Sequence, residues 1–299
     1  MIIAVTGSTG LVGSALVAAL EARGHLVRRL VRHEVQDAER EIRWNPDRGE
    51  IDAAELNGVD AVVHLAGENV AGGRWSEDFK RRILESRTKG TRLLAETLAG
   101  LELKPSVMAS ASATGYYGNR GDEEVDELAP SGNGFLAEVC REWEAAAQPA
   151  HDAGIRLVKL RIGPVLSPKG GALAKMLLPF KLGLGGVIGS GRQYFSWITL
   201  DDLVSAIVFA LETESLVGPV NAVTPFAVTN REFTKTLGRV LGRPTIFPMP
   251  AFAARLAFGE MADEMLLGGV RVAPHELTAA HFQFAYPEFE PALRHLLGK

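Results

Sequence analysis

The sequence predicts an α/β protein built on a doubly wound parallel sheet. Over the first two thirds of the chain, apolar strand-like segments alternate with segments of helical periodicity. This alternation is typical of a parallel sheet that is covered by helices on both faces. A glycine-rich turn directly after the first strand supports the same class. The length of 299 residues suits one large α/β unit with a smaller appendage.

The expected elements follow in order along the chain. Strands are expected at residues 1–5, 26–31, 61–66, 106–112 and 156–162, and helices at residues 14–22, 75–98 and 138–150. Glycine and proline become frequent after residue 163, and residues 196–199 and 220–223 are expected to return to the sheet around a helix at 201–211. We therefore expect a nucleotide-binding domain at 1–165, completed around 195–223, and a smaller, mostly helical substrate-side domain at 166–194 and 224–299.

The turn after the first strand has the spacing Gly-x-x-Gly-x-x-Gly. Gly7 allows the tight turn, Gly10 lets the backbone approach a pyrophosphate, and Gly13 lets the next helix pack close to the sheet. The amides at the start of that helix then face the anion. We therefore expect a Rossmann-like domain whose phosphate-binding residues are Gly7, Ser8, Thr9, Gly10, Leu11, Val12 and Gly13.

The tip of the second strand favours NADP as the cofactor. An acidic residue at this position would bind the ribose hydroxyls of NAD, but the strand ends in Val31-Arg32-His33. A guanidinium suits the 2′-phosphate of NADP, so Arg32 is the expected ligand. NAD is the less favoured alternative, since a rotation of the loop would bring Glu34 to the ribose.

The composition argues against several other classes of protein. A net charge of −4 gives no electrostatic case for binding nucleic acid or an anionic membrane. No apolar run reaches the roughly 18 to 20 residues that span a bilayer, and no basic leader precedes the first strand. Cys140 is the only cysteine, which fits a reducing compartment, so a cytoplasmic location is expected. The histidines show no metal-ligand spacing.

Several short motifs together resemble the extended short-chain dehydrogenase/reductase family, which includes nucleotide-sugar epimerases. The matching segments are the glycine loop at 5–13, the strand beneath the cofactor at 62–67, the serine-bearing strand at 110–114, and later segments at 160–166 and 197–202. Residues 248–297 resemble the tail of an atypical epimerase-like branch of that family. The resemblance implies an NADP site that includes Leu65, Ala66 and Gly67, a small-molecule substrate of the nucleotide-sugar type, and a homodimer.

The proton-transfer pair of that family is missing from this chain. Family enzymes carry a Tyr-x-x-x-Lys pair on the helix after the serine strand. The lysine lowers the pKa of the tyrosine, so that the phenol exchanges a proton as hydride moves. Counted from Ser112, the expected positions hold Phe135 and Val139, which carry no exchangeable proton.

Three interpretations of this loss remain open. In the first, another group exchanges the proton. Ser112 and Tyr117 are the catalytic candidates and Tyr116 is a substrate-binding candidate, while core packing is the alternative for Tyr117 and a solvent-facing position is the alternative for Glu138. In the second, the chain binds NADP without turnover and acts as a regulator, a role drawn by analogy from members of the same branch that are associated with division of the cell or organelle. In the third, substrate groups or water carry the proton.

Three more side chains have expected roles. His64 is expected to be a bonded core or cofactor-side residue rather than a base. Arg161, in a predicted buried strand, needs a partner, and the alternatives are Asp201 or Asp202 and the edge of the nicotinamide. Arg192, in a glycine-rich loop, is the candidate ligand for a substrate diphosphate, with a simple surface position as the alternative.

Overall fold

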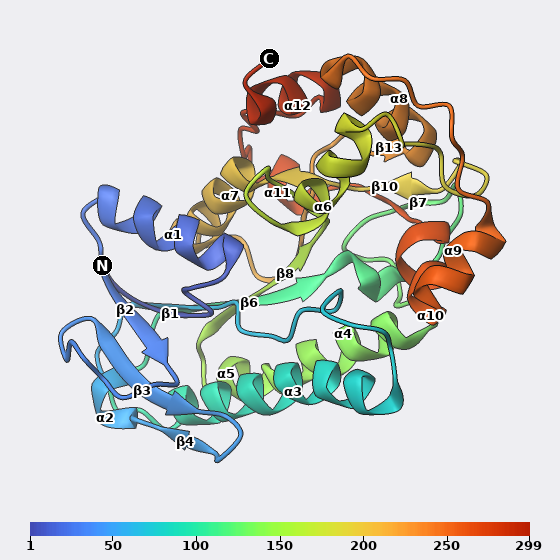
Figure 1. Cartoon of the computed structure of the whole chain (residues 1–299). Coiled ribbons are helices and arrows are strands. Elements are labelled where there is room, and N and C mark those ends of the chain that lie inside the picture. Colours follow the sequence, from blue (N-terminus) through green and yellow to red (C-terminus); the bar gives the residue numbers. More distant parts are fainter. The chain divides into compact units, whose positions relative to one another are not determined.

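The computed structural model describes all 299 residues and divides into two compact units (Figure 1). The first unit comprises Met1–Ser112, Val139–Leu160 and Val204–Val220, and the second comprises Ala113–Glu138, Arg161–Leu203 and Asn221–Lys299. Each unit has a hydrophobic core of its own. The chain therefore crosses between the units several times, and helices and strands that begin in one unit end in the other.

A largely parallel sheet of eight strands forms the centre of the first unit. The strands, in the order β12-β8-β6-β5-β1-β2-β3-β4, are Gly218–Ala222, Arg156–Ile162, Val107–Ala113, Ala61–His64, Ile2–Thr6, Leu26–Val31, Glu41–Asn45 and Glu50–Ile51. β1 is parallel to both β2 and β5, and the short β4 is antiparallel to β3. The sheet confirms the predicted fold class. Sequence periodicity missed β3 and β4, whose short segments are interrupted by charged residues.

Helices cover both faces of this sheet. Figure 1 shows α1 (Leu11–Ala22) on one face and α3 (Glu77–Ala99) with α5 (Gln148–Asp152) on the other. The short α2 (Ala53–Leu56), most of α4 (Phe135–Ala146) and most of α7 (Leu200–Glu212) complete the unit. No helix combines the length and the apolar character that crossing a bilayer requires.

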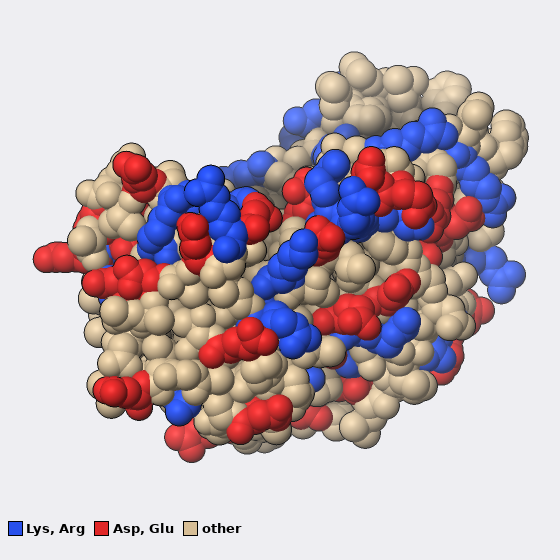
Figure 2. Space-filling model, turned by 90° about the horizontal axis from the view of Figure 1, so that it is seen from below, with Lys and Arg blue, Asp and Glu red and all other residues tan.

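The outer face of α3 carries paired charges. Lys80 lies 3.7 Å from Glu77, and Lys89 lies 2.9 Å from Glu85, at the three- and four-residue spacings that place side chains together on a helix. Figure 2 shows basic and acidic side chains intermixed over the face of the molecule that it presents. That face has no continuous basic area of the kind that binds nucleic acid.

The second unit is mostly helical and contains three two-stranded sheets. The sheets pair β10 (Tyr194–Phe195) with β13 (Val228–Thr229), β11 (Ile198–Thr199) with β9 (Val165–Leu166), and β14 (Arg271–Val272) with β7 (Glu124–Val125). The helical elements are η1 (Thr114–Tyr117), α6 (Gly171–Lys181), α8 (Asn230–Leu241), α9 (Ala251–Phe258), α10 (Glu260–Ala262), η2 (Asp263–Leu267), α11 (His275–Ala279) and α12 (Phe289–Leu297). The rings of Trp197, Phe233 and Phe289 pack together in its core.

One of the two segments that were expected to return to the main sheet does so. β12 belongs to the eight-stranded sheet, beside β8. The expectation for residues 196–199 was wrong, because β11 pairs with β9 in a separate two-stranded sheet. A short apolar segment is compatible with many buried strand positions, so its sequence does not show which strand it pairs with.

A buried chain of hydrogen bonds ties the end of β1 to the end of β5. Thr6 Oγ1 lies 2.8 Å from Nδ1 of His64 and accepts the backbone N–H groups of Leu65 and Ala66 at 3.0 and 3.2 Å. Since this oxygen accepts two bonds, it donates its proton to Nδ1, and the ring donates from Nε2 to Thr91 Oγ1 at 2.8 Å. Burial lowers the pKa of His64 to about 4. His64 is therefore a neutral, fully bonded core residue.

We expect His64 to weaken the protein in acid. Unfolded histidine takes up a proton near pH 6.5, whereas the folded residue resists protonation until about pH 4. Folding stability should therefore fall between these pH values, by about 3 kcal/mol in total. Urea unfolding at pH 7 and pH 4.5 should show a smaller pH dependence in His64→Gln than in the wild type. His275→Gln, at an exposed site, should keep the wild-type dependence, and an unchanged slope in His64→Gln would contradict the assignment.

Candidate functional site

The strand order reverses at β1, which has β2 on one side and β5 on the other. In open α/β sheets, ligands bind at such a switch point, outside the carboxyl ends of the strands. Here a Cβ on Gly7, whose φ is +66°, would lie 2.9 Å from the carbonyl carbon of Leu65. A Cβ on Gly13 would lie 2.1 Å from the carbonyl oxygen of Gly7. Both glycines are therefore required by close backbone contacts, as the sequence predicted.

The N-terminus of α1 has no cap from its own chain. Gly10 stands at the N-cap without a side chain, and the first turn contains no acidic residue. The first backbone bond runs from Ser14 to Gly10 at 2.9 Å, which leaves the amides of Leu11, Val12 and Gly13 without a partner in the protein. By contrast, α3 and α8 have side-chain caps and acidic first turns. Free amides and the positive end of the helix dipole suit an anion.

The loop after β5 continues the same edge of the sheet. The amides of Leu65 and Ala66 are fixed by Thr6, and the amide of Glu68 donates to Ser86 Oγ on α3 at 3.0 Å. The loop is thus anchored to β1 and to α3. The structure brings two sets of predicted cofactor-binding residues to this edge, namely Gly7, Ser8, Thr9, Gly10, Leu11, Val12 and Gly13 in the turn and Leu65, Ala66 and Gly67 in the loop.

Arg32 directly follows β2, at the same end of the sheet. It is exposed and forms no ion pair. Its carbonyl oxygen accepts a hydrogen bond from Nη1 of Arg43, on β3, which places a second guanidinium beside it. Glu41 holds the intervening loop, because its carboxylate accepts the Gln36 amide at 2.9 Å and lies 3.6 Å from His33. The sequence did not indicate Arg43, because β3 itself was not predicted.

Ser112 lies at the carboxyl end of β6, and its partner is a buried acid on α4. Its Oγ donates to Glu144 Oε1 at 2.8 Å, and both residues are buried. This contact fixes which face of α4 is turned toward the serine. Four and seven residues before Glu144, on the same face of the helix, stand Cys140 and Ala137, so the pair Phe135 and Val139 obtained by counting lies off this face. Neither set provides a phenol or an ammonium group.

Arg87 is a cation that the sequence analysis did not single out. It lies on the inner side of α3, where it contacts the loop after β5 and the indole of Trp143. The sequence contained a signal for this residue. Arg87 follows Ile83 by four residues and precedes Leu94 by seven, which places it on the helix face of these two buried apolar residues. A charged residue within an apolar helical stripe needs a specific partner.

Tyr116, Tyr117 and Arg161 form a cluster in the second unit. Tyr117 is fully buried, donates to Asn221 Oδ1 at 2.7 Å and accepts from Arg161 at 2.9 Å. Arg161 also donates to the carbonyl of Glu127 at 3.2 Å, and its Cζ lies 3.5 Å from the centre of the Tyr116 ring. Burial raises the pKa of Tyr117 to about 12. Of the two alternatives for Tyr117, the geometry favours packing over contact with a substrate.

The acids considered for Arg161 bind other groups. Asp202 accepts the amides of Ala285 and Tyr286 at 2.7 and 3.0 Å. Asp201 lies 3.0 Å from Nε2 of His295. These contacts anchor α12 and the segment before it to the start of α7.

Two predicted site positions in the second unit are open to solvent. Arg192 is exposed and lies 3.7 Å from Asp122, which is exposed as well. Such a pair contributes about 1 kcal/mol or less, so the guanidinium remains accessible to an anion. Glu138 is also exposed, on the outer side of α4.

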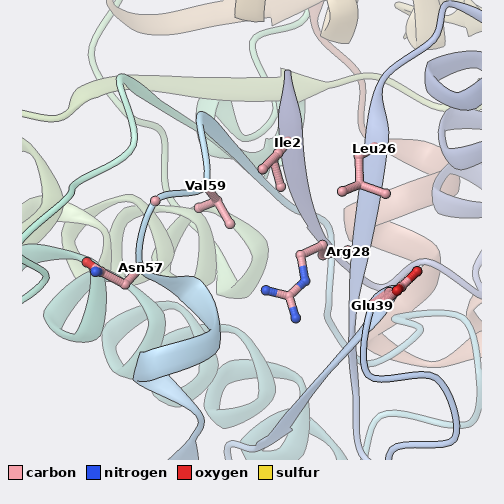
Figure 3. Close-up of a pocket in the computed structure, with 7 residues that line it drawn as sticks. Ile2, Leu26, Arg28, Glu39, Asn57 and Val59 are labelled. Carbon is pink, nitrogen blue, oxygen red and sulfur yellow. The ribbon is translucent and has the colours of Figure 1, made fainter.

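A pocket in the first unit lies at the other edge of the sheet (Figure 3). It is lined by Ile2, Leu26, Arg28, Glu39, Asn57, Gly58 and Val59. Ile2 and Leu26 begin β1 and β2 and pair in register. The pocket therefore opens at the amino ends of the strands, away from the glycine turn. No cluster of three His, Cys, Asp or Glu side chains is placed to hold a metal ion.

The sheet order, the glycine turn and the uncapped α1 define a Rossmann-type α/β protein. The chain belongs to the NAD dependent epimerase/dehydratase family, whose model matches residues 3–222. Residues 249–296 match a domain of unknown function, DUF1731.

Relatives and solved structures extend this assignment over the whole chain. The epimerase family protein Mb2239 of Mycobacterium bovis is 48% identical over 292 residues, which cover 98% of this chain and 96% of the relative. The crystal structure of human epimerase family protein SDR39U1 with NADPH superposes with a TM-score of 0.91 at 38% identity, and 100% of each chain is covered. A nucleoside-diphosphate sugar epimerase from Corynebacterium glutamicum gives a TM-score of 0.83 at 39% identity over 100% of this chain and 58% of that one.

We expect Gly13→Ala to destabilise the first unit, because the new methyl group would overlap the Gly7 carbonyl. Overpacking of this kind costs about 1–3 kcal/mol, measurable by urea unfolding. Gly73→Ala is the control, since nothing lies within 4 Å of its Cβ position. Equal stability of the two variants would show that α1 does not need this close approach.

We expect Tyr117→Phe to act on stability. Removal of the hydroxyl leaves the buried Oδ1 of Asn221 without its donor and takes one acceptor from Arg161, which costs about 1–3 kcal/mol. Tyr194→Phe should be nearly neutral, because no partner of its hydroxyl is present. Thermal unfolding checks the difference, and a Tyr117→Phe protein as stable as the wild type would contradict the structural role.

Proposed function

We propose that this protein binds NADP(H) at the carboxyl edge of its main sheet. The observation that carries the proposal is the uncapped N-terminus of α1, with three free amides behind a turn that only glycine fits. A diphosphate supplies the acceptors and the negative charge that this helix end lacks. The glycine turn and the loop from Leu65 to Gly67 would hold the dinucleotide from its two sides.

The basic tip of β2 favours NADP(H) over NAD(H). Arg32 is exposed without an ion pair, and Arg43 lies beside it. Two guanidinium groups suit the doubly charged 2′-phosphate, and no acidic side chain stands at the strand tip to bind a free ribose. The human relative was crystallised with NADPH, which supports the same choice.

The reaction that we propose is a hydride exchange with a small molecule that carries a hydroxyl or carbonyl group. Bound NADPH supplies the hydride chemistry. Ser112 donates its own proton to Glu144, so its oxygen is left to accept a hydrogen bond from a substrate hydroxyl. Tyr116 and Arg192 are the proposed substrate ligands. A nucleotide sugar is the proposed substrate class, as the name of the Corynebacterium glutamicum relative suggests.

A second candidate function is regulation by bound NADP(H) without turnover. The observation in its favour is the composition of α4, where neither Ala137 and Cys140 on the face of Glu144 nor the counted pair Phe135 and Val139 provides a phenol or an ammonium group. Tyr117, the other phenol considered, is buried and bonded on both sides. Such a protein would respond to the NADPH/NADP⁺ ratio, and a link to cell or organelle division is the proposed setting.

A screen for turnover separates the two candidates. The purified protein with NADPH, and separately with NADP⁺, is incubated with nucleotide sugars and with a set of carbonyl compounds, while absorbance at the reduced nicotinamide band is recorded. Products are also analysed for epimers, since an epimerase shows no net absorbance change. Turnover of any compound excludes the purely regulatory function.

We propose a cytoplasmic protein and a homodimer, the latter because the family resemblance implies one. Light scattering of the purified protein, with and without NADPH, measures the assembly directly.

We expect Arg32→Ala to weaken NADPH binding roughly 10- to 100-fold, because charge-assisted hydrogen bonds contribute about 1.5–3 kcal/mol. Affinity for NADH, which has no 2′-phosphate, should change far less. Calorimetric titration with both cofactors measures the two effects. Arg23→Ala, at the far end of α1, is the control. Equal losses for NADPH and NADH would remove the argument from Arg32.

A further inference from the structure

Arg87, in the middle of α3, is a cation whose hydrogen-bonding capacity is largely unused. Nη1 donates to the carbonyl oxygen of Ile83 at 3.1 Å, and no Asp or Glu forms an ion pair with the guanidinium. A guanidinium has five N–H donors, so most of them have no partner in the protein. The cations on the outer face of α3, such as Lys89 with Glu85, are paired instead.

The surroundings of Arg87 hold its guanidinium in one place. Its Cζ lies 3.4 Å from the position that a Cβ of Gly67 would occupy, and 4.9 Å from the centre of the Trp143 ring. The group thus lies between the loop after β5 and the indole on α4. Burial lowers the pKa of the guanidinium, and Glu68 and Cys140 partly offset this effect. A partly buried cation of this kind is stabilised when a ligand satisfies its free donors.

The contacts along the sheet edge lead from the glycine turn to Arg87. Gly7 approaches Leu65, and Gly67, two residues later, approaches Arg87. Arg32 lies on the opposite side of β1, because β2 and β5 flank that strand. A dinucleotide with its 2′-phosphate at Arg32 and its diphosphate at α1 therefore extends its second nucleoside across β5, toward Arg87.

The geometry assigns Arg87 as the ligand of the nicotinamide ribose, whose neighbouring hydroxyl oxygens accept its free N–H groups. This inference rests on the proposed NADP(H) site. The absence of a side chain on Gly67 leaves room for the guanidinium of Arg87, and this guanidinium lies over the ring of Trp143. In the enzymes of the family, a lysine on the helix that corresponds to α4 provides a positive charge. In this protein Arg87, on α3 and opposite Cys140, provides that charge instead.

A fixed cation beside the nicotinamide distinguishes the two redox states of the cofactor. The oxidised ring carries a positive charge and the reduced ring carries none. Arg87 therefore disfavours NADP⁺ relative to NADPH, by roughly fivefold or more when two such charges lie within several ångströms at a protein surface. A side chain with only a structural role would not affect this preference.

Calorimetric titrations of Arg87→Gln test the assignment with three ligands, NADPH, NADP⁺ and adenosine 2′,5′-bisphosphate, which lacks the nicotinamide riboside. We expect NADPH to bind at least tenfold more weakly, and the bisphosphate to bind within about twofold of the wild type. The preference for NADPH over NADP⁺ should also shrink. Arg92→Gln, on the exposed face of the same helix, should match the wild type with all three ligands.

The outcomes separate this inference from the proposed function. A wild-type protein that binds neither NADPH nor the bisphosphate contradicts the proposed function itself. A wild type that binds NADPH, with an Arg87→Gln variant that binds it equally well, overturns only the role of Arg87. An equal loss of affinity for all three ligands in Arg87→Gln likewise overturns only the role of Arg87. If Arg87→Gln does not fold, Arg87→Lys is the variant to measure. The lysine variant should keep the preference for NADPH over NADP⁺ but bind NADPH several-fold more weakly. Wild-type affinities in this variant would overturn the assignment.

Discussion

The close approach of three backbone segments at one edge of the sheet is the constraint on which the rest of the site depends. The turn at Gly7 touches the loop after β5, and Gly13 brings the first turn of α1 against the Gly7 carbonyl. Thr6 then fixes that loop through the amides of Leu65 and Ala66. These contacts leave no space for side chains and place the uncapped first turn of α1 at the switch point of the sheet.

The distribution of charge supports the same site. Over α3, basic side chains lie beside acidic ones and are largely neutralised. At the carboxyl edge of the sheet, neither Arg32 nor Arg87 forms an ion pair, although Glu68 lies near enough to Arg87 to act on its pKa, and the first turn of α1 contains no carboxylate. The proposed dinucleotide would satisfy these groups together, with its phosphates at Arg32 and α1 and a ribose at Arg87. The unpaired cations thus have a common explanation in one dinucleotide.

The chemistry beyond binding depends on what replaces the missing phenol. Tyr117 is fully buried, which raises its pKa, and its hydroxyl is bonded to Asn221 and Arg161. Ser112 donates a hydrogen bond to Glu144, a buried carboxylate that is not part of the family's Tyr-x-x-x-Lys pair. Proton transfer in a protein with these side chains follows another route than the family's or does not take place.

The sequence by itself determined the fold class, the glycine turn, the basic tip of β2 and the loss of the Tyr-x-x-x-Lys pair. These features are local, because strand and helix periods, and the steric demands on Gly7 and Gly13, are carried by neighbouring residues. Only the tertiary structure decided the face of α4 that meets Ser112, the buried position of Tyr117, the pairing of β11 with β9, and the place of Arg87 beside Gly67. Each of these features depends on contacts between segments that are far apart in the chain, and a local sequence pattern does not encode such contacts.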